Sequence, residues 1–281
     1  MPARILYAGQ EAKVVTNAAT TKYLPVQSAS CEVTRPIEDV LTFGRLGSVG
    51  RFQANVATCK ADIKTYLAIT GGNVNNLINS AFLTALTGES VDGKVSTITV
   101  TPNGFNMSGI LTSFGVDIAV GGFAMADFSF VGVGEPTFNA APTSNTTTEQ
   151  GNMPSSFTPA TTASVGGQAS GGCAQSFKFS LDIPTESLVC LGGAISGTQG
   201  DVASNVLQVA KPPFKATISV EGSAVDAPTG SQLTSQFIVG KIGFTLPKAQ
   251  VTSRSFNNAV GQVGASYSYT MEDVNVTFAD V

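Results

Sequence analysis

The sequence predicts a mainly β protein built from two tandem, similar β-rich units with one or two short helices; the β-sandwich or barrel-like form of each unit is implied by a resemblance given below. Two observations predict this fold class. Apolar residues alternate with polar ones over several long stretches, as in strands with one buried face. In addition, two stretches about half the chain apart resemble each other without a gap. We expect a first unit over 1–136, a Ser/Thr/Pro/Gly-rich linker or loop over 137–174 and a second unit over 175–281.

The internal similarity occurs at both ends of the expected units. QSASCEVTRPIEDVLTFG begins at Gln27 and QSFKFSLDIPTESLVCLG begins at Gln175, with Gln, Ser, Pro, Glu and Gly at the same places. AVGGFAMADFSF begins at Ala119 and AVGQVGASYSYT begins at Ala259. The two matches occur in the same order along the chain. This collinearity indicates a duplicated unit.

Strands give the clearest local pattern. From Phe177 to Ile183, apolar and polar residues alternate strictly. From Ile110 to Phe130, apolar residues occupy even-numbered positions, with a turn or bend expected at Gly121-Gly122. Pro36 and Pro184 are expected to end the pairing of the strands before them. Further strands are expected at Val95–Val100, Lys215–Val220 and Phe237–Leu246.

The helical pattern is confined to two segments. Apolar residues between Val74 and Ala85 fall at helical spacing, with Asn73 as the expected N-cap and Gly88 just past the end. The second unit offers only a short candidate, Val202–Ala210, which Pro212 would end.

Composition argues against catalysis and nucleic-acid recognition. The net charge is −4, only 12% of residues are charged, and there is no His, the commonest general base and metal ligand. Phosphate-binding, dinucleotide-binding and nucleophile-elbow motifs are absent from the sequence. The adjacent carboxylates Glu38-Asp39 and Glu272-Asp273 would point to opposite faces of a strand. We therefore expect no enzyme, no catalytic residue, no cofactor and no metal.

The cysteines and the N-terminus suggest the compartment. Cys31, Cys59, Cys173 and Cys190 show no C-x-x-C spacing, which favours buried free thiols, although a disulfide stays open. The start MPARILYAGQEAKVV lacks the pattern of a signal peptide, and no apolar run approaches 18 residues. We expect a protein that is made in the cytoplasm and does not insert into a membrane.

Two of the quoted segments resemble a known family. A strand with the pattern S-x-S-x followed by R-P-I-E-D-V-L-T-F-G, and the close S-F-G-V-D-I-A-V-G-G-F-A-M-A-D-F-S-F-V-G-V-G, resemble the tail tube proteins of long-tailed bacteriophages. The resemblance implies β-sandwich-like units with a flanking helix, six to a ring, and rings that stack into a tube through which DNA passes. Some members of the family fuse two units, so that three chains make a pseudo-hexameric ring.

The resemblance also implies localisation and partners. The chain would be a structural virion protein of the phage tail, assembled in the host cytoplasm. Its partners would be copies of itself, with a trimeric pseudo-hexamer favoured over a hexamer, and other tail proteins. Phage DNA would pass through during ejection without specific binding.

The candidate functional residues follow from the predicted faces and loops. A channel for sliding DNA should not offer clustered cations to phosphates, and the face opposite the predicted core is small, polar and weakly acidic. The candidate lumen-facing residues are Ser113, Asp117, Asp127, Ser129, Ser266, Ser268, Thr270 and Glu272. The loop Thr42–Phe52 is the candidate for contact between rings, with an ordinary surface loop as the equal alternative; its candidate residues are Thr42, Phe43, Gly44, Arg45, Arg51 and Phe52.

Two other functions share some of these features. Another self-assembling β-rich virion or surface protein, such as a capsid decoration protein or a fibre, would also show alternating strands and low charge. A β-sandwich enzyme acting on polysaccharide would need carboxylates facing each other across a cleft.

Overall fold

The computed structural model describes residues 10–16, 20–44, 46–53, 56–67, 78–87, 95–101, 104–119, 122, 124–138, 163–165, 173–189, 206–210, 214–223, 233–239, 242–258 and 266–280. The protein is mainly β, as the sequence predicts, with one helix in this part of the chain, α1 (Ser80–Thr87). The strands are β1 (Gln10–Val15), β2 (Thr21–Thr34), β3 (Ile37–Leu41), β4 (Ser48–Gln53), β5 (Thr58–Tyr66), β6 (Ser96–Thr101), β7 (Phe105–Ala119), β8 (Met125–Val133), β9 (Thr137–Phe138), β10 (Ala163–Val165), β11 (Cys173–Asp182), β12 (Thr185–Val189), β13 (Val206–Ala210), β14 (Lys215–Ser223), β15 (Leu233–Val239), β16 (Ile242–Asn257), β17 (Ser266–Asp273) and β18 (Thr277–Asp280).

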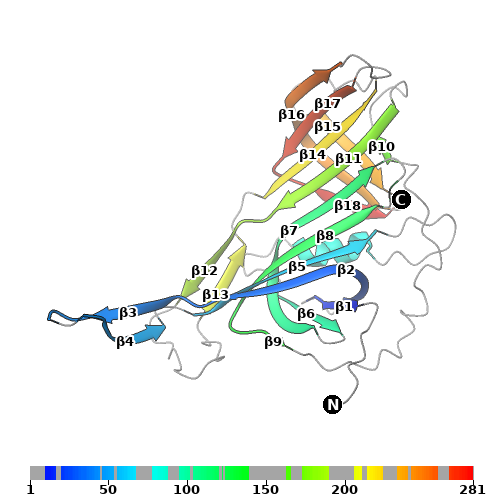
Figure 1. Cartoon of the computed structure of the whole chain (residues 1–281). Coiled ribbons are helices and arrows are strands. Elements are labelled where there is room, and N and C mark those ends of the chain that lie inside the picture. Colours follow the sequence, from blue (N-terminus) through cyan, green and yellow to red (C-terminus); the bar gives the residue numbers. More distant parts are fainter. Residues whose placement is uncertain are drawn as a thin grey trace.

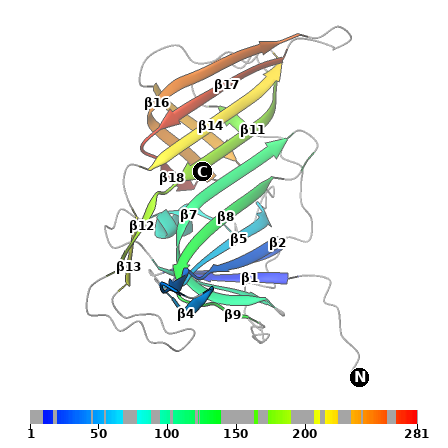
Figure 2. The same ribbon diagram turned by 60° about the vertical axis from the view of Figure 1, so that its left-hand side comes forward.

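One antiparallel sheet runs through both halves of the chain (Figure 1). Its order is β10-β15-β16-β17-β14-β11-β7-β6-β1-β2-β5-β8, and β7 also pairs with β8. The pairings of β7, β6, β1, β2, β5 and β8 therefore form a closed circuit, as in a small barrel. Figure 2 shows the long strands β16, β17, β14, β11, β7, β8, β5 and β2 side by side from top to bottom. The junction between the halves is the pairing of β11 with β7, from Ser176 opposite Ala119 to Asp182 opposite Ser113.

The two halves have strands in the same order. β2, β5, β8 and β7 are neighbours in the first half, and β11, β14, β17 and β16 are neighbours in the second. A bulge interrupts β7 between Leu111 and Ser113 and β16 between Val251 and Ser253. The threonine at each bulge donates its hydroxyl to a carbonyl of the facing strand: Thr112 to Ser129 over 3.1 Å, and Thr252 to Thr270 over 3.4 Å.

A single hydrophobic core joins the halves. The Phe179 ring lies 5.9 Å from the Phe114 ring and 4.7 Å from the Phe244 ring, measured between centroids, and all three side chains are fully buried. The core also contains Phe128 and Tyr269 from β8 and β17. Alternation along the strands places these residues on one face of the sheet, which is why the sequence pattern predicts them.

The helix packs on this core face. Phe82 of α1 meets Phe128 edge to face at 6.3 Å between ring centroids. The Asn79 side chain accepts a hydrogen bond from the Phe82 backbone N–H over 2.9 Å, so Asn79 is the N-cap. The prediction of Asn73 as N-cap is wrong for this helix, because the helix begins at Ser80; Asn73 lies outside the described residues.

Other predicted elements are partly confirmed. The strands expected near 95–100 and 215–220 are β6 and β14. The strand expected at Phe237–Leu246 is two strands, β15 and β16. The helix predicted at Val202–Ala210 is wrong over its second half, since Val206–Ala210 forms β13 by pairing with β12. The range interpreted as a linker contains β9, β10 and the start of β11.

Two hairpins extend from the sheet. β3 and β4 follow β2 and precede β5 in the sequence. They form a separate two-stranded sheet that projects away from the body (Figure 1). β12 and β13 form a second hairpin between β11 and β14, and β13 lies against β7 and β8. The loop predicted at Thr42–Phe52 is thus a turn followed by β4. Gly44 and Gly47 in the turn have φ values of 86° and 125°, which favour glycine.

Candidate assembly surface

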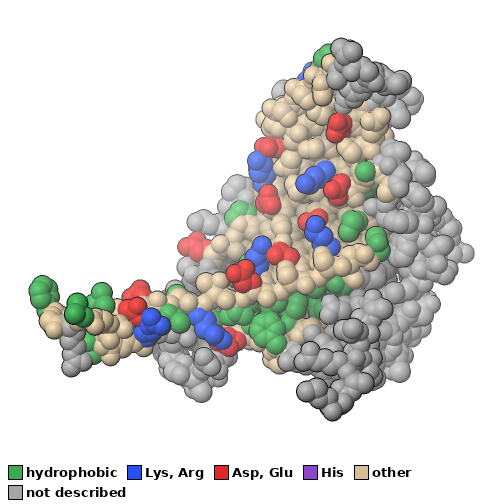
Figure 3. All heavy atoms as spheres, in the orientation of Figure 1, with side chains coloured by type: hydrophobic (Ala, Val, Ile, Leu, Met, Phe, Trp, Pro, Cys, Tyr) green, Lys and Arg blue, Asp and Glu red, His purple; other side chains and the backbone are tan. Residues whose placement is uncertain are grey.

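The sheet face opposite the core, here called the polar face, crosses both halves (Figure 3). Residues directly opposite each other on paired strands share a face, so Lys64 opposite Asp127 and Lys178 opposite Asp117 belong to it. Carboxylates outnumber lysines there, and the two are interspersed. The charged residues of this face on β2, β5, β7, β8, β11, β14 and β17 are Glu32, Lys60, Asp62, Lys64, Asp117, Asp127, Lys178, Asp182, Lys215, Glu221 and Glu272.

Short polar contacts tie the strands of this face together. Ser129 donates its hydroxyl to the Asp62 carboxylate. The Lys215 ammonium lies 3.0 Å from the Glu272 carboxylate, and the Ser219 and Thr270 hydroxyls are 3.1 Å apart. Such exposed pairs add little stability, so this face is held chiefly by the core beneath it.

Asp127 has the most perturbed carboxyl of the polar face. Partial burial raises its pKa, Lys64 and Lys178 oppose the shift, and Asp117 and Asp62 add to it. Gly115 lies opposite Asp127, and a Cβ at Gly115 would approach the carboxylate to 2.6 Å. The absent side chain of Gly115 therefore makes room for the Asp127 side chain.

In the described part of the sheet, two strand segments are paired on one side only. Among the described residues, only β5 pairs with β2 from Ser28 to Thr34, and the described pairing of β1 with β2 covers Thr21 to Val26. Within the same described part, only β17 pairs with β16 from Gln250 to Asn257. We call these the β2 edge and the β16 edge. An open edge of this length presents backbone donors and acceptors to another strand.

Apolar side chains accompany both open edges. Ala29, Cys31 and Val33 of β2 lie at the margin of the core and are partly buried. Phe256 of β16 is 59% exposed and packs its ring 5.1 Å from that of Tyr267. Burial, with a smaller contribution from Cys59, raises the pKa of the Cys31 thiol to about 11. Cys31 and Cys59, the cysteines whose side chains are described, are free thiols, as the spacing favours.

The β3–β4 hairpin, here called the arm (Ile37–Gln53), exposes apolar side chains along its length. Its two strands are held by their own ladder and by an ion pair of 2.6 Å between Arg51 and Asp39. Figure 3 shows its apolar side chains clustered where the arm projects. The exposed apolar residues of the arm are Ile37, Val40, Leu41, Phe43, Leu46 and Val49. An isolated two-stranded hairpin is marginal in water, so this exposed apolar hairpin is a candidate contact surface.

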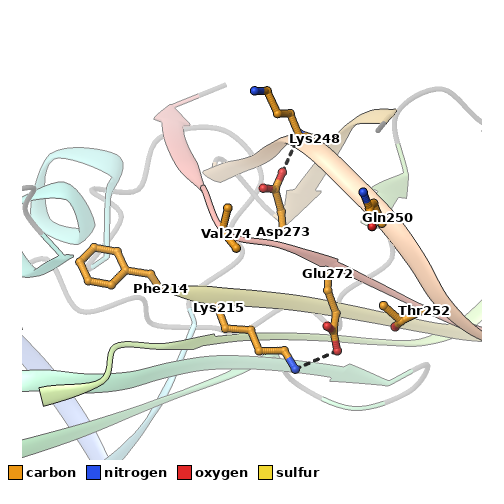
Figure 4. Close-up of a pocket in the computed structure, with 8 residues that line it drawn as sticks. All are labelled: Phe214, Lys215, Lys248, Gln250, Thr252, Glu272, Asp273 and Val274. Atoms are coloured by element: carbon orange, nitrogen blue, oxygen red, sulfur yellow. Dashed lines mark hydrogen bonds and ion pairs between the residues drawn. The ribbon is translucent and has the colours of Figure 1, made fainter. Parts of the chain in front are cut away.

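A groove of about 440 Å³ opens where β14, β16 and β17 come together (Figure 4). It holds the ion pair of Lys215 with Glu272, and the Asp273 carboxylate accepts the backbone N–H of Lys248 over 2.6 Å. Asp273 also accepts the backbone N–H of Asn275 over 3.0 Å. The groove is lined by Phe214, Lys215, Lys248, Gln250, Thr252, Glu272, Asp273 and Val274.

The candidate lumen residues fall on the polar face. Asp117 is exposed, and the others with described side chains are half-buried: Ser113, Asp127, Ser129, Ser268, Thr270 and Glu272. Ser266 belongs to β17, and its side chain is outside the description. The structure brings these residues into one surface across β7, β8 and β17, and the pairing of β7 with β11 links the two groups.

The candidate inter-ring residues fall on the arm. Thr42, Phe43 and Gly44 are exposed at its turn, and Arg51 is exposed on β4. Arg45 and the side chain of Phe52 lie outside the description. Sequence reasoning missed the two open edges and the groove. The gapless match between the segment after Gln27, in β2, and the segment after Gln175, in β11, is the sequence signal that could have revealed the β2 edge.

The candidate site consists of the polar face, the two strand edges, the arm and the groove. In the part of the chain that the structure describes, no cluster of three or more acidic, cysteine or histidine residues could hold a metal ion. No described helix has the length and apolarity needed to cross a membrane. No protein-family model matches the chain, and no curated protein is significantly similar to it.

Proposed function

We propose that the protein is a structural virion protein that assembles into rings, and that the rings stack into the tail tube of a long-tailed phage, a conduit for DNA ejection. One observation carries the proposal. The β2 edge and the β16 edge correspond to β11 and β7, which are already paired with each other inside the chain. The internal junction is therefore a template for a junction between copies.

Structural features shared by the two halves support this correspondence. Both halves have the same strand order, a hairpin after the first strand, and a bulge with a threonine bonded to the facing strand. Ser28–Thr34 then corresponds to Ser176–Asp182, because both follow the matched glutamines Gln27 and Gln175. Ser253–Asn257 corresponds to the segment of β7 that begins at Ser113, because both begin just after the bulge.

The internal register predicts the register between copies. Phe179 lies opposite Val116, and Lys178 lies opposite Asp117. The corresponding pairs are Cys31 with Phe256, and Ser30 with Asn257. This pairing would satisfy the backbone groups of both edges and cover the exposed Phe256 ring, so it removes the two features that a lone chain leaves to solvent.

Three copies joined in this way would close a ring. Each would contribute eight strands, β2, β5, β8, β7, β11, β14, β17 and β16. At about 4.8 Å per strand and a tilt of about 40°, the backbone of such a barrel would be about 48 Å across. Barrels of about 16 to 18 strands already leave an aqueous channel, so this one would leave room for a duplex.

The polar face would line that channel. The helix α1 and the core lie on the other face, which places them outside the barrel. Lysines are interspersed with more numerous carboxylates on the polar face, which suits DNA that slides without tight phosphate contacts. Asp117, Asp127 and Glu272 would then face the lumen.

Contacts between rings would use the turn of the arm. Phe43 and Leu46 are fully exposed there, and Arg51 of β4 is exposed on the same hairpin. A projecting hairpin with an apolar tip can reach a neighbouring ring without disturbing the sheet.

Electron microscopy of the concentrated, untagged protein tests the proposal. The expected result is hollow stacked rings with three chains in each, counted in end-on views. Solid fibres would favour a fibre protein, and a monodisperse monomer at high concentration would contradict assembly. Six chains per ring would keep the tube but contradict the equivalence of the two halves.

A further inference from the structure

We propose that the groove formed by β14, β16 and β17 is the docking site for the arm of a neighbouring copy of the same chain. The inference rests on the proposed ring assembly. It names the contact partner of two surfaces that the edge pairing alone leaves uncovered, the strands of the arm and the open groove. The turn of the arm stays available for the neighbouring ring, and the docked strands would cover Glu272 at the margin of the lumen, whereas Asp117 and Asp127 lie outside the groove.

The chain contains an internal example of this contact. The second hairpin follows β11, and β13 lies against β7 and β8. At its root, the Ile183 backbone N–H donates to the Thr112 carbonyl over 2.8 Å. Ile110 lies opposite Val131 on the side of the sheet away from the core, yet it is only 2% exposed. We infer that the second hairpin covers this pair.

The groove is the corresponding place on the second half. Ile110 and Gln250 each lie two residues before the threonine at the bulge, Thr112 and Thr252. Val131 lies opposite Ile110, and Glu272 lies opposite Gln250. Three of these corresponding residues, Gln250, Thr252 and Glu272, line the groove. A copy joined at the β16 edge would place its arm there, because the arm follows β2 as the second hairpin follows β11.

The chemistry of each hairpin matches the surface assigned to it. The second hairpin, TESLV paired with VLQVA, is rich in aliphatic residues, and its surface carries Ile110 and Val131. The arm adds the charged residues Glu38, Asp39 and Arg51 on its strands. The groove likewise carries charges, with Lys215, Lys248, Glu272 and Asp273 in its lining. Within the chain, an aliphatic hairpin lies beside an apolar surface. Between copies, an arm that carries charged side chains beside its exposed apolar ones would meet a groove whose lining is likewise part charged and part apolar.

This difference has a functional consequence. The internal contact forms once, during folding, and tolerates a dry apolar interface. The contact between copies must be absent in the soluble monomer and form during assembly, and charged side chains keep both surfaces hydrated until then. The docked arm would therefore be sensitive to ionic strength, because exposed charge pairs are screened by salt.

Cross-linking between two different variants tests the docking. One variant carries Glu38→Cys on the arm and the other carries Lys248→Cys in the groove, both with Cys173 and Cys190 changed to Ser. They are mixed as monomers, assembled, and treated with a short bismaleimide. The matched control mixes the arm variant with Lys178→Cys, another exposed lysine, which lies on β11 of the polar face.

The expected result is a covalent dimer in the first mixture, at least about tenfold more abundant than in the control. Rings that form without this cross-link, or with equal cross-linking in the control, would overturn the docking and leave the proposed function standing. Absence of rings in the unmodified protein would instead overturn the proposed function. A second variant replaces Glu38–Arg51 by a short turn; if its rings form and survive dilution and salt as the wild type's do, the docking is also overturned.

Discussion

The backbone N–H of Ile183 donates a hydrogen bond to the carbonyl of Thr112 over 2.8 Å, one residue beyond the last paired residues of β11 and β7. This bond sits at the junction of the two halves, where the polar face continues from β7 to β11. The core beneath the junction is equally continuous, since Phe179 packs between Phe114 and Phe244. The halves therefore fold as one body.

Removal of the Phe179 ring should destabilise both halves together. Phe179→Ala is expected to lower the free energy of unfolding by about 3 to 5 kcal/mol, because it leaves a cavity at the centre of the shared core. Chemical denaturation of the monomer should still show a single transition. Phe43→Ala on the exposed arm serves as control and should change the stability by less than about 0.5 kcal/mol. Two separate transitions would contradict the continuous core.

Tyr269 predicts a stabilising substitution. Its hydroxyl is buried and finds no hydrogen-bond partner among the described residues, while its ring fills the core. Tyr269→Phe removes the unsatisfied hydroxyl and keeps the ring, so we expect a gain of about 1 kcal/mol at neutral pH. A loss of stability would show that the hydroxyl has a partner.

The same residue predicts the alkaline stability. Burial raises the pKa of Tyr269 from 10.0 to about 12, so the folded chain holds this proton more tightly than the unfolded chain. Its stabilising contribution is complete below pH 10 and is lost as the pH rises toward 12. The advantage of Tyr269→Phe should therefore grow above pH 10. Comparison with the wild type cancels the similar loss from Cys31, whose pKa is about 11.

Asp127 predicts a second stabilising substitution, one that removes an ionised carboxylate. Burial raises its pKa, so the ionised form is held less well in the folded chain than in the unfolded one. Asp127→Asn should increase stability at pH 7. The difference should shrink as the pH falls through the raised pKa of the folded chain toward 3.8, and it should be lost below 3.8, where both states bind the proton. A variant less stable than the wild type at pH 7 would mean that Lys64 and Lys178 outweigh the burial.

The core-lining strands were predictable from sequence because one of their faces is buried. Phe177, Phe179 and Leu181 alternate with polar residues, and burial enforces that period. The same alternation placed the candidate lumen residues on one face. The helix was predicted to begin too early in the chain, because it begins at Ser80 and Asn79 caps it.

The hairpins and edges were less accessible to sequence reasoning. Val206–Ala210 is a short apolar run whose periodicity suits helix or strand, and only its pairing with β12 settles the choice. The pairing of β7 with β11 joins segments far apart in the chain, so no local pattern specifies it. The groove likewise gathers Phe214, Lys248 and Asp273 from three separate places.

The central claim is that the β2 edge of one copy pairs with the β16 edge of the next in the register of the internal junction. The most direct measurement introduces Ser30→Cys and Asn257→Cys into one chain with Cys173 and Cys190 changed to Ser, and cross-links it after assembly. Directly opposite residues lie about 5 Å apart, so covalent dimers and trimers should form and the ladder should close at three chains. The control, Ser30→Cys with Ser253→Cys, separates the thiols by about 13 Å along the strand and should give far less product. Absence of the ladder in the first variant, or equal ladders in both, would contradict the account.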